Sequence, residues 1–118
     1  MSRLRTAQQL TGQAGEEQAL EYLLSQGFRL VERNFHCRGG EIDLIVQKDG
    51  MLLFVEVRKR ASGQFGGAAA SVIPAKQARL KKAAQFYLQR YADPPPCRFD
   101  VIAIDGNQLN WITNAIEE

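Results

Sequence analysis

The sequence has few of the residues on which several large protein classes depend. It contains only 2 cysteines, Cys37 and Cys97, which excludes a disulfide framework and a cysteine-rich zinc site. Its 1 histidine, His36, excludes catalysis by a pair of histidines. No apolar run approaches the roughly 18 residues that a membrane-spanning helix needs. We therefore expect no membrane span, no signal peptide behind the basic N-terminus, and a cytoplasmic location.

Acidic residues are absent from the stretch between Glu56 and Asp93, although the net charge of the whole chain is only +2. The basic residues in this stretch are Arg58, Lys59, Arg60, Lys76, Arg79, Lys81, Lys82 and Arg90. Such segregation is typical of a face that binds a polyanion. The alternative is a solvated helix surface that the acidic N-terminal third balances in space. Charge alone leaves both interpretations open.

The rest of the composition indicates one folded domain. Hydrophobic residues make up 45% and charged residues 24% of the 118 residues, which is close to the globular average. We expect a single domain over residues 1–118, with the polar residues 1–13 forming a loose N-terminal arm. The sequence leaves the oligomeric state open, with a homodimer among the alternatives.

Hydrophobic periodicity and turn residues predict the order αβββαββ. The expected helices span residues 15–26 and 74–91, and the expected strands span residues 28–34, 41–47, 51–58, 99–104 and 109–112. Residues 36–40 are expected to form a loop, and the glycine-rich residues 61–71 another. This order in one small domain predicts an α/β fold, a mixed β-sheet flanked by helices.

The central pair of strands permits a more detailed prediction. Asp49-Gly50 between two apolar runs is a strong hairpin signal, and a two-residue turn there pairs Lys48 with Met51. Counting back along the ladder places Asp43 opposite Glu56. Side chains alternate along a strand, so one face is expected to carry Glu41, Asp43, Glu56 and Arg58, while Ile42, Leu44, Val55 and Val57 point into a core.

Two carboxylates that face each other across a ladder destabilise it unless something offsets their repulsion. Arg58, which the same register places opposite Glu41, is one candidate, and a hard divalent cation with carboxylate ligands is another. Glu16 lies on the apolar face of the first predicted helix, either as a third carboxylate of this group or as an acid that stabilises the helix N-terminus. Lys76 lies at the edge of the second apolar stripe, where a snorkelling lysine is the alternative to a functional one.

These residues resemble a known arrangement. An acid on a first helix, followed by an aspartate and an E-x-K motif on a hairpin, is the signature of the PD-(D/E)XK nuclease superfamily. The sequence is most similar to the YraN-like family of endonucleases, which are related to archaeal Holliday junction resolvases. The resemblance covers roughly residues 11–116, and the segments that carry it are GEEQALEYL, RNFHCRGGEIDLI, FVEVRKR, FGGAAASV, KQARL and CRFDVIAI with the late Trp111.

The resemblance implies a restriction-endonuclease-like core and a catalytic set of Glu16, Asp43, Glu56 and Arg58. Glu16, Asp43 and Glu56 would be ligands of Mg²⁺ or Mn²⁺, with the backbone carbonyl of Val57 as a further ligand. Arg58 stands where the superfamily has lysine. Arginine is effectively always protonated and cannot act as a general base, but it can stabilise charge on a phosphate. Lys76 could supply part of the missing lysine chemistry.

The function that the resemblance implies is metal-dependent hydrolysis of phosphodiester bonds in DNA, with branched or damaged DNA as candidate substrates. The residues expected to hold nucleic acid are Lys59, Arg60, Lys76, Arg79, Lys81 and Lys82. The loop over residues 61–71, with Phe65, either closes on the DNA or is an ordinary connection. One alternative is a nucleic-acid-binding domain with weakened or lost catalysis. Another is an interaction protein in which Glu41 and Glu56 form a salt-bridge network with Arg58.

Overall fold

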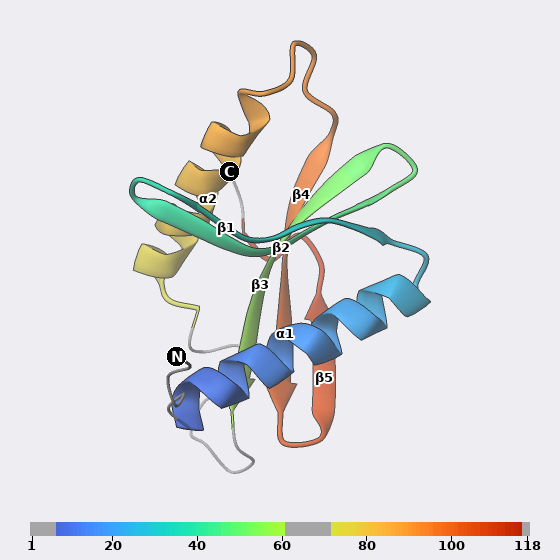
Figure 1. Cartoon of the computed structure of the whole chain (residues 1–118), viewed down its shortest axis with the longest axis vertical. Coiled ribbons are helices and arrows are strands. Elements are labelled where there is room, and N and C mark those ends of the chain that lie inside the picture. The colour runs from blue at the N-terminus through green and yellow to red at the C-terminus, as the bar shows by residue number, and fades with distance from the viewer. Residues whose placement is uncertain (1–6, 61–71, 117–118) are drawn as a thin grey trace, which may run out of the picture.

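The computed structural model describes residues 7–60 and 72–116, with side chains from residue 14 onward. The elements are α1 (Ala7–Ser25), β1 (Arg29–Cys37), β2 (Gly40–Lys48), β3 (Met51–Arg60), α2 (Pro74–Leu88), β4 (Cys97–Asp105) and β5 (Gln108–Ile112). This is the predicted order αβββαββ (Figure 1). The glycine-rich segment 61–71, including Phe65, lies outside the described residues.

The fold is the predicted α/β arrangement of a mixed sheet with a helix on each face. The sheet has 5 strands in the order β1-β2-β3-β4-β5, so the predicted hairpin of β2 and β3 lies near its centre. β3 and β4 are parallel and are connected through α2, whereas the other neighbours are antiparallel. Figure 1 shows α1 and α2 on opposite sides of the sheet. The arrangement is consistent with a restriction-endonuclease-like core.

Two hydrophobic layers hold the helices on the sheet. The layer under α2 contains Phe35, Ile42, Ile45, Leu52, Phe54, Leu80, Ala83, Ala84, Tyr87, Phe99, Val101 and Ile116. The layer under α1 contains Ala19, Leu20, Leu23, Phe28, Leu44, Val46, Leu53, Val55, Val57, Ile102 and Ile104. Successive residues of β3 alternate between the two layers, because side chains alternate along a strand. A strand covered on both faces reads as a continuous apolar run, which is the pattern seen in β3 and β4.

The predicted turn between β2 and β3 is confirmed. Lys48 pairs with Met51, and the ladder continues in the predicted register up to the pair of Leu44 with Val55. Asp49 and Gly50 have φ angles of 52° and 80°. Positive φ at both central residues is what a type I′ hairpin turn requires.

The first strand is longer than predicted. We expected a strand over residues 28–34 and a loop over 36–40, but β1 continues to Cys37 and joins β2 through a tight turn at Arg38-Gly39. Gly39 has a φ of 85°, a conformation open to glycine at little cost. As a result His36, which the loop prediction left without a role, lies opposite Glu41.

The first helix also begins earlier than predicted. α1 starts at Ala7, so residues 7–13 belong to the helix and not to the expected arm 1–13. Ala7, Gln8, Gln9 and Leu10 are good helix formers, and a helix can extend past the part that packs on the core. Residues 1–6 lie outside the described residues. Neither α1 nor α2 combines the length and apolar character of a membrane span within the part of the chain that the structure describes.

Asp100 anchors the C-terminal end of the fold. Its side chain is fully buried and accepts hydrogen bonds from the Arg98 guanidinium at 2.8 and 2.9 Å, from Trp111 Nε1 at 2.8 Å and from the backbone N–H of Asn114 at 2.9 Å. A buried carboxylate is tolerated only when it is paired in this way. Asp100 therefore ties β4 to β5 and to the turn that follows.

Candidate functional site

The candidate site lies where β2 and β3 separate, a point that we call the fork. The pairing of these strands ends at Leu44 with Val55. Beyond it, β2 continues beside β1 as far as Gly40, and β3 continues beside β4 as far as Arg60. Figure 1 shows the hairpin of β1 and β2 turning away from β3 and towards α2. At the fork, therefore, the backbone groups of β2 and β3 no longer pair with each other.

The fork changes the last steps of the predicted ladder. Asp43 and Glu56 follow the final pair, and the Asp43 carboxylate accepts a hydrogen bond from the backbone N–H of Val57 at 2.8 Å. A side-chain carboxylate thus binds a backbone donor of β3 just past the end of the ladder. The divergence also turns β2, so Ile42 packs in the layer under α2, whereas Leu44, Val55 and Val57 pack under α1. The prediction that all four apolar residues share one face is wrong for Ile42.

The structure brings the Asp43 and Glu56 carboxyl groups into hydrogen-bonding contact with each other. Glu56 is only 8% exposed. Burial, and secondly the charge of Asp43, raises the pKa of Glu56 to about 8. Burial also raises the pKa of Asp43, against the opposing effect of its hydrogen bond from Val57. Both shifts have the cause expected for acids in a low-dielectric site, and they favour a proton shared between the two groups.

Glu16 approaches the same site from α1. Burial raises the pKa of Glu16, and the nearby Asp43 carboxylate raises it further. Arg33 opposes this shift from a distance of 4.0 Å, while it pairs more closely with Glu17, at 2.7 Å. Glu16 is thus half-buried beside the fork. The alternative that it stabilises the helix N-terminus is wrong, because α1 begins at Ala7 and Glu16 lies well inside the helix. Among residues 7–60 and 72–116, no group of three or more His, Cys, Asp or Glu side chains is arranged to hold a metal ion.

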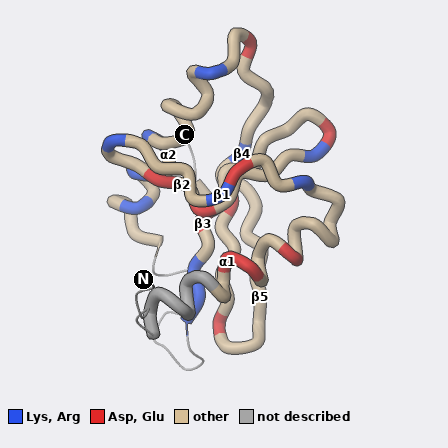
Figure 2. Tube along the Cα trace, in the orientation of Figure 1, with Lys and Arg blue, Asp and Glu red and all other residues tan. Residues whose placement is uncertain are grey.

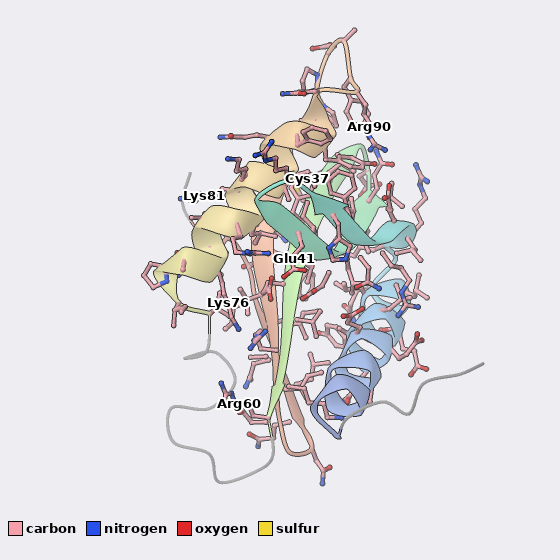
Figure 3. The ribbon with its side chains drawn as sticks, turned by 60° about the vertical axis from the view of Figure 1, so that its left-hand side comes forward. Cys37, Glu41, Arg60, Lys76, Lys81 and Arg90 are labelled. Atoms are coloured by element: carbon pink, nitrogen blue, oxygen red, sulfur yellow. The ribbon has the colours of Figure 1, made fainter. Side chains whose placement is uncertain are left out.

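A cleft of about 290 Å³ opens beside the fork towards α2, lined by Glu41, Glu56, Arg58, Lys76 and Arg79. Arg58 Nη1 lies 3.7 Å from Glu56 Oε1. Burial and the charge of Arg58 lower the pKa of Lys76, against the attraction of Glu56. Figure 3 shows Glu41 of β2 and Lys76 near the start of α2 at neighbouring positions, and both line the cleft. The cleft therefore combines the buried Glu56 and the partly exposed Glu41 with three basic side chains.

Glu41 has different partners from those that the extended ladder predicted. Its carboxylate lies 3.4 Å from His36 Nδ1 and 3.7 Å from Arg79 Nη2, whereas the predicted position was opposite Arg58. The cause is the fork, because β2 pairs only with β1 at this point. Of the predicted salt-bridge network, the contact of Glu56 with Arg58 is present. His36 could have been found by recognising Arg38-Gly39 as a hairpin turn.

The structure divides the predicted nucleic-acid-binding residues between different surfaces. Lys76 and Arg79 line the cleft, and Arg60 lies near enough to affect the pKa of Lys76. Lys82 lies against Gly39 of the hairpin turn. Lys59 instead points towards α1 and donates a hydrogen bond to Gln18 at 3.3 Å. Figure 2 shows the basic positions of α2 and of the turn between β1 and β2 on the same side of the molecule.

The fold and the site define a class of protein: a small α/β domain with a pair of joined, buried carboxyl groups beside a basic cleft. The chain belongs to the YraN-like family, whose model, described as "Uncharacterised protein family UPF0102", matches residues 15–104. A UPF0102 protein of Janthinobacterium sp. (strain Marseille) is 64% identical over 115 residues, covering 98% of this chain and 94% of the relative.

Two further relatives show the same similarity over nearly their whole lengths. A UPF0102 protein of Herminiimonas arsenicoxydans is 62% identical and covers 99% of this chain and 94% of its own length. One of Methylibium petroleiphilum is 52% identical and covers 90% of this chain and 93% of its own length. The names of these relatives state the family and no activity, so the chemistry of the site has to be argued from its residues.

Proposed function

We propose that this protein is a metal-dependent endonuclease of the PD-(D/E)XK superfamily that hydrolyses phosphodiester bonds of DNA. The observation that carries the proposal is the pair of carboxyl groups of Asp43 and Glu56, joined by a hydrogen bond at the fork and beside a cleft lined by basic residues. A stability role alone gives no reason to bury two acids together, because each raises the cost of ionising the other.

The donor set fits Mg²⁺ or Mn²⁺. Both ions prefer carboxylate oxygens, and a cation held by Asp43 and Glu56 would offset the repulsion between the two ionised groups. The hydrogen bond from Val57 fixes one oxygen of Asp43, which orients the other ligand atoms. Glu16 is suited to an outer position, through water. Such an ion supplies charge neutralisation of the phosphate and an activated water.

The basic residues of the cleft have separate roles in this proposal. Arg58, which keeps its charge at any ordinary pH, stabilises the extra negative charge that develops on the phosphate as the water oxygen attacks phosphorus. Lys76, whose pKa is lowered, donates a proton to the oxygen that leaves as the bond to phosphorus breaks. Arg79 holds a neighbouring phosphate at the rim of the cleft.

The substrate class follows from the resemblance and from the charge. A basic surface that contacts phosphates binds DNA with little sequence preference, so the proposed specificity is for DNA structure, with branched or damaged DNA as the first candidates. We place this activity in the cytoplasm. The second candidate function is DNA binding with weakened or lost catalysis, which the arginine at position 58 favours because it cannot act as a base.

Cleavage of a panel of single-stranded, duplex and four-way DNA in the presence of Mn²⁺ tests the proposal. The wild-type protein should cut at least one of them, and Glu56→Ala should abolish cutting. Glu21→Ala, which removes an exposed acid of α1, is the matched control and should retain activity. Binding without cutting would favour the second candidate. Neither binding nor cutting would favour the interaction protein.

A further inference from the structure

A row of exposed side chains extends from the cleft along α2, and the proposed chemistry does not use most of it. We call it the stripe; it consists of Arg79, Lys82, Phe86 and Arg90. The first three follow one another at the spacing of one helix face, and Arg90 lies in the turn after α2. The eleven residue steps from Arg79 to Arg90 correspond to about 16 Å at helical rise. Arg79 also lines the cleft, so the stripe begins where the proposed site ends.

Each member of the stripe lies against the hairpin of β1 and β2. Arg79 contacts Glu41, and the carbon stem of Lys82 passes within about 3.2 Å of where a side chain on Gly39 would begin. The rings of Phe86 and Phe35 have centroids 6.3 Å apart. The Arg90 guanidinium lies 5.6 Å from the centre of the Phe35 ring. The stripe therefore lies along the line where α2 packs on the hairpin, and these contacts fix its shape. Figure 3 shows this contact between α2 and the hairpin, with Lys76 near its lower end and Arg90 near its upper end.

Phe86 is the unusual member, because 55% of it is exposed. The core beneath it is already filled by Phe35, Phe54 and Tyr87, which are buried, and the Tyr87 ring packs edge-to-face with each of the other two. The Phe86 ring is tilted against Phe35 at the outside of this cluster and leaves much of its surface to solvent. A single exposed apolar residue needs no explanation by itself, but this one lies between basic residues on both sides.

The charges around Phe86 favour a polyanion over an apolar partner. Lys82 and Arg90 flank it four residues away on either side, and Arg38 is exposed in the hairpin turn opposite. Two acids face the same surface: Glu32, whose carboxylate is 3.6 Å from Arg90, and Glu41 beside Arg79. The basic residues still outnumber them. An aromatic ring set in a basic track is the combination that binds single strands, because bases stack on rings while cations hold the phosphates.

We propose that the stripe binds a single-stranded segment of DNA, with a base stacked on Phe86 and phosphates on Arg79, Lys82 and Arg90. This inference rests on the proposed function, since the stripe would lead an unpaired strand into or out of the cleft where cleavage is proposed. A duplex would keep its bases inside the stack and could not offer one to Phe86. The substrate class is therefore DNA that carries an unpaired strand next to the cleavage site.

The test is the affinity of a short single-stranded oligodeoxynucleotide that contains one 2-aminopurine, measured in EDTA so that cleavage plays no part. Phe86→Ala should weaken this binding about tenfold, within the range of one lost stacking contact, and should abolish the change in 2-aminopurine fluorescence. Phe86→Trp should retain both. Duplex affinity should not change in either variant. Leu24→Ala, at an α1 position that is 47% exposed, is the matched control and should bind like the wild type.

Several results would overturn the inference. If Phe86→Ala binds the single strand as tightly as the wild type, and its circular dichroism spectrum matches that of the wild type, there is no stacking contact on Phe86. An equal loss of duplex and single-strand binding would show a general effect of the substitution. Tighter binding of the oligoribonucleotide of the same sequence would assign the stripe to RNA. If Phe86-dependent binding is present but no substrate is cut, the stripe is supported and the proposed nuclease activity fails.

Discussion

At the scale of single residues, the decisive feature is a pair of acids held close together, each with a raised pKa. Asp43 and Glu56 are joined at the fork, and burial is the largest cause of the raised pKa of each. An acid with a raised pKa keeps its proton in the folded protein at a pH where it has lost it in the unfolded chain. The stability of the metal-free protein therefore depends on pH in a direction that can be stated.

We expect the metal-free protein to lose stability as the pH rises from the ordinary glutamate value of 4.5 to about 8, the folded pKa of Glu56. In that interval the folded state binds more protons than the unfolded state, so the free energy of unfolding falls with pH. Glu56→Gln mimics the protonated acid, and it should be more stable than wild type at high pH by about 1–3 kcal/mol. Urea denaturation in EDTA at several pH values measures the free energy of unfolding of the wild type and of Glu56→Gln.

A bound divalent cation should reverse the loss of stability that the metal-free protein shows as the pH rises. Adding Mn²⁺ should stabilise the wild type more at high pH than at low pH, because the ion competes with the proton that Glu56 binds below its raised pKa. Glu56→Gln should lose most of this effect. A stability of the wild type that rises steadily with pH in EDTA would contradict the raised pKa values of the pair and, with them, the reason for placing a metal at the fork.

Arg58→Lys decides what the arginine does. If Arg58 is a weakened substitute for the superfamily lysine, lysine should preserve or raise the rate of DNA cleavage. If Arg58 makes a bidentate contact with phosphate, lysine should lower the rate, because the two side chains are not interchangeable at such a site. Single-turnover cleavage with Mn²⁺ measures the effect. Equal folding stability of the two proteins is the control, since Arg58 also contacts Glu56 at 3.7 Å.

At the scale of secondary structure elements, the contact between α2 and the hairpin of β1 and β2 shapes the cleft. Gly40 permits this contact. A Cβ atom at Gly40 would lie 2.4 Å from the backbone oxygen of Arg79 and 2.8 Å from the backbone nitrogen of Ala83. Both atoms belong to the helix backbone, so neither can move aside without moving α2. The absence of a side chain at position 40 thus sets how close Arg79 comes to Glu41.

Gly40→Ala should therefore destabilise the protein by about 2 kcal/mol or more, through overpacking, and should reduce activity at the cleft. Gly50→Ala is the comparison, because that site has no atom within 4 Å but has a φ of +80°. It should cost only about 1 kcal/mol, through backbone strain, and leave activity unchanged. Thermal unfolding and DNA cleavage measure the two effects. Equal losses in both variants would mean that close packing at Gly40 has no special role.

At the scale of the whole molecule, the basic residues are expected to act through the charge of one face. Replacing Lys81 and Lys82 by glutamate should weaken DNA binding and flatten its dependence on salt, because fewer counterions are released on binding. Replacing Arg29 and Lys48 by glutamate makes the same change in net charge near the opposite end of β2, where the two residues contact Gln47 and Gln26. This control should leave the salt dependence unchanged. Fluorescence anisotropy over a series of salt concentrations measures both, and identical slopes would mean that net charge alone governs binding.

Local sequence determined much of this protein. The type I′ turn at Asp49-Gly50 followed from the dipeptide, because few residues adopt positive φ at both positions. That turn fixed the register as far as Leu44 and Val55, and alternation then placed most of the core. Helical periodicity placed Glu16 on the apolar face of the first helix, although it left open whether Glu16 joins the acidic group. Each of these features depends on neighbours within a few residues or on a single pairing.

Only the tertiary structure decided where the ladder ends. The fork arises because β2 follows β1 and β3 follows β4, and no local pattern in residues 41–58 encodes that choice between partners. The fork placed Glu41 beside His36 and Arg79, and it placed Ile42 under α2. It also let the Asp43 carboxylate accept a hydrogen bond from the backbone of β3, at a place where burial raises the pKa of Asp43 beside Glu56. Desolvation depends on every element that covers a site, so the sequence could predict the pair but not the raised pKa of its members.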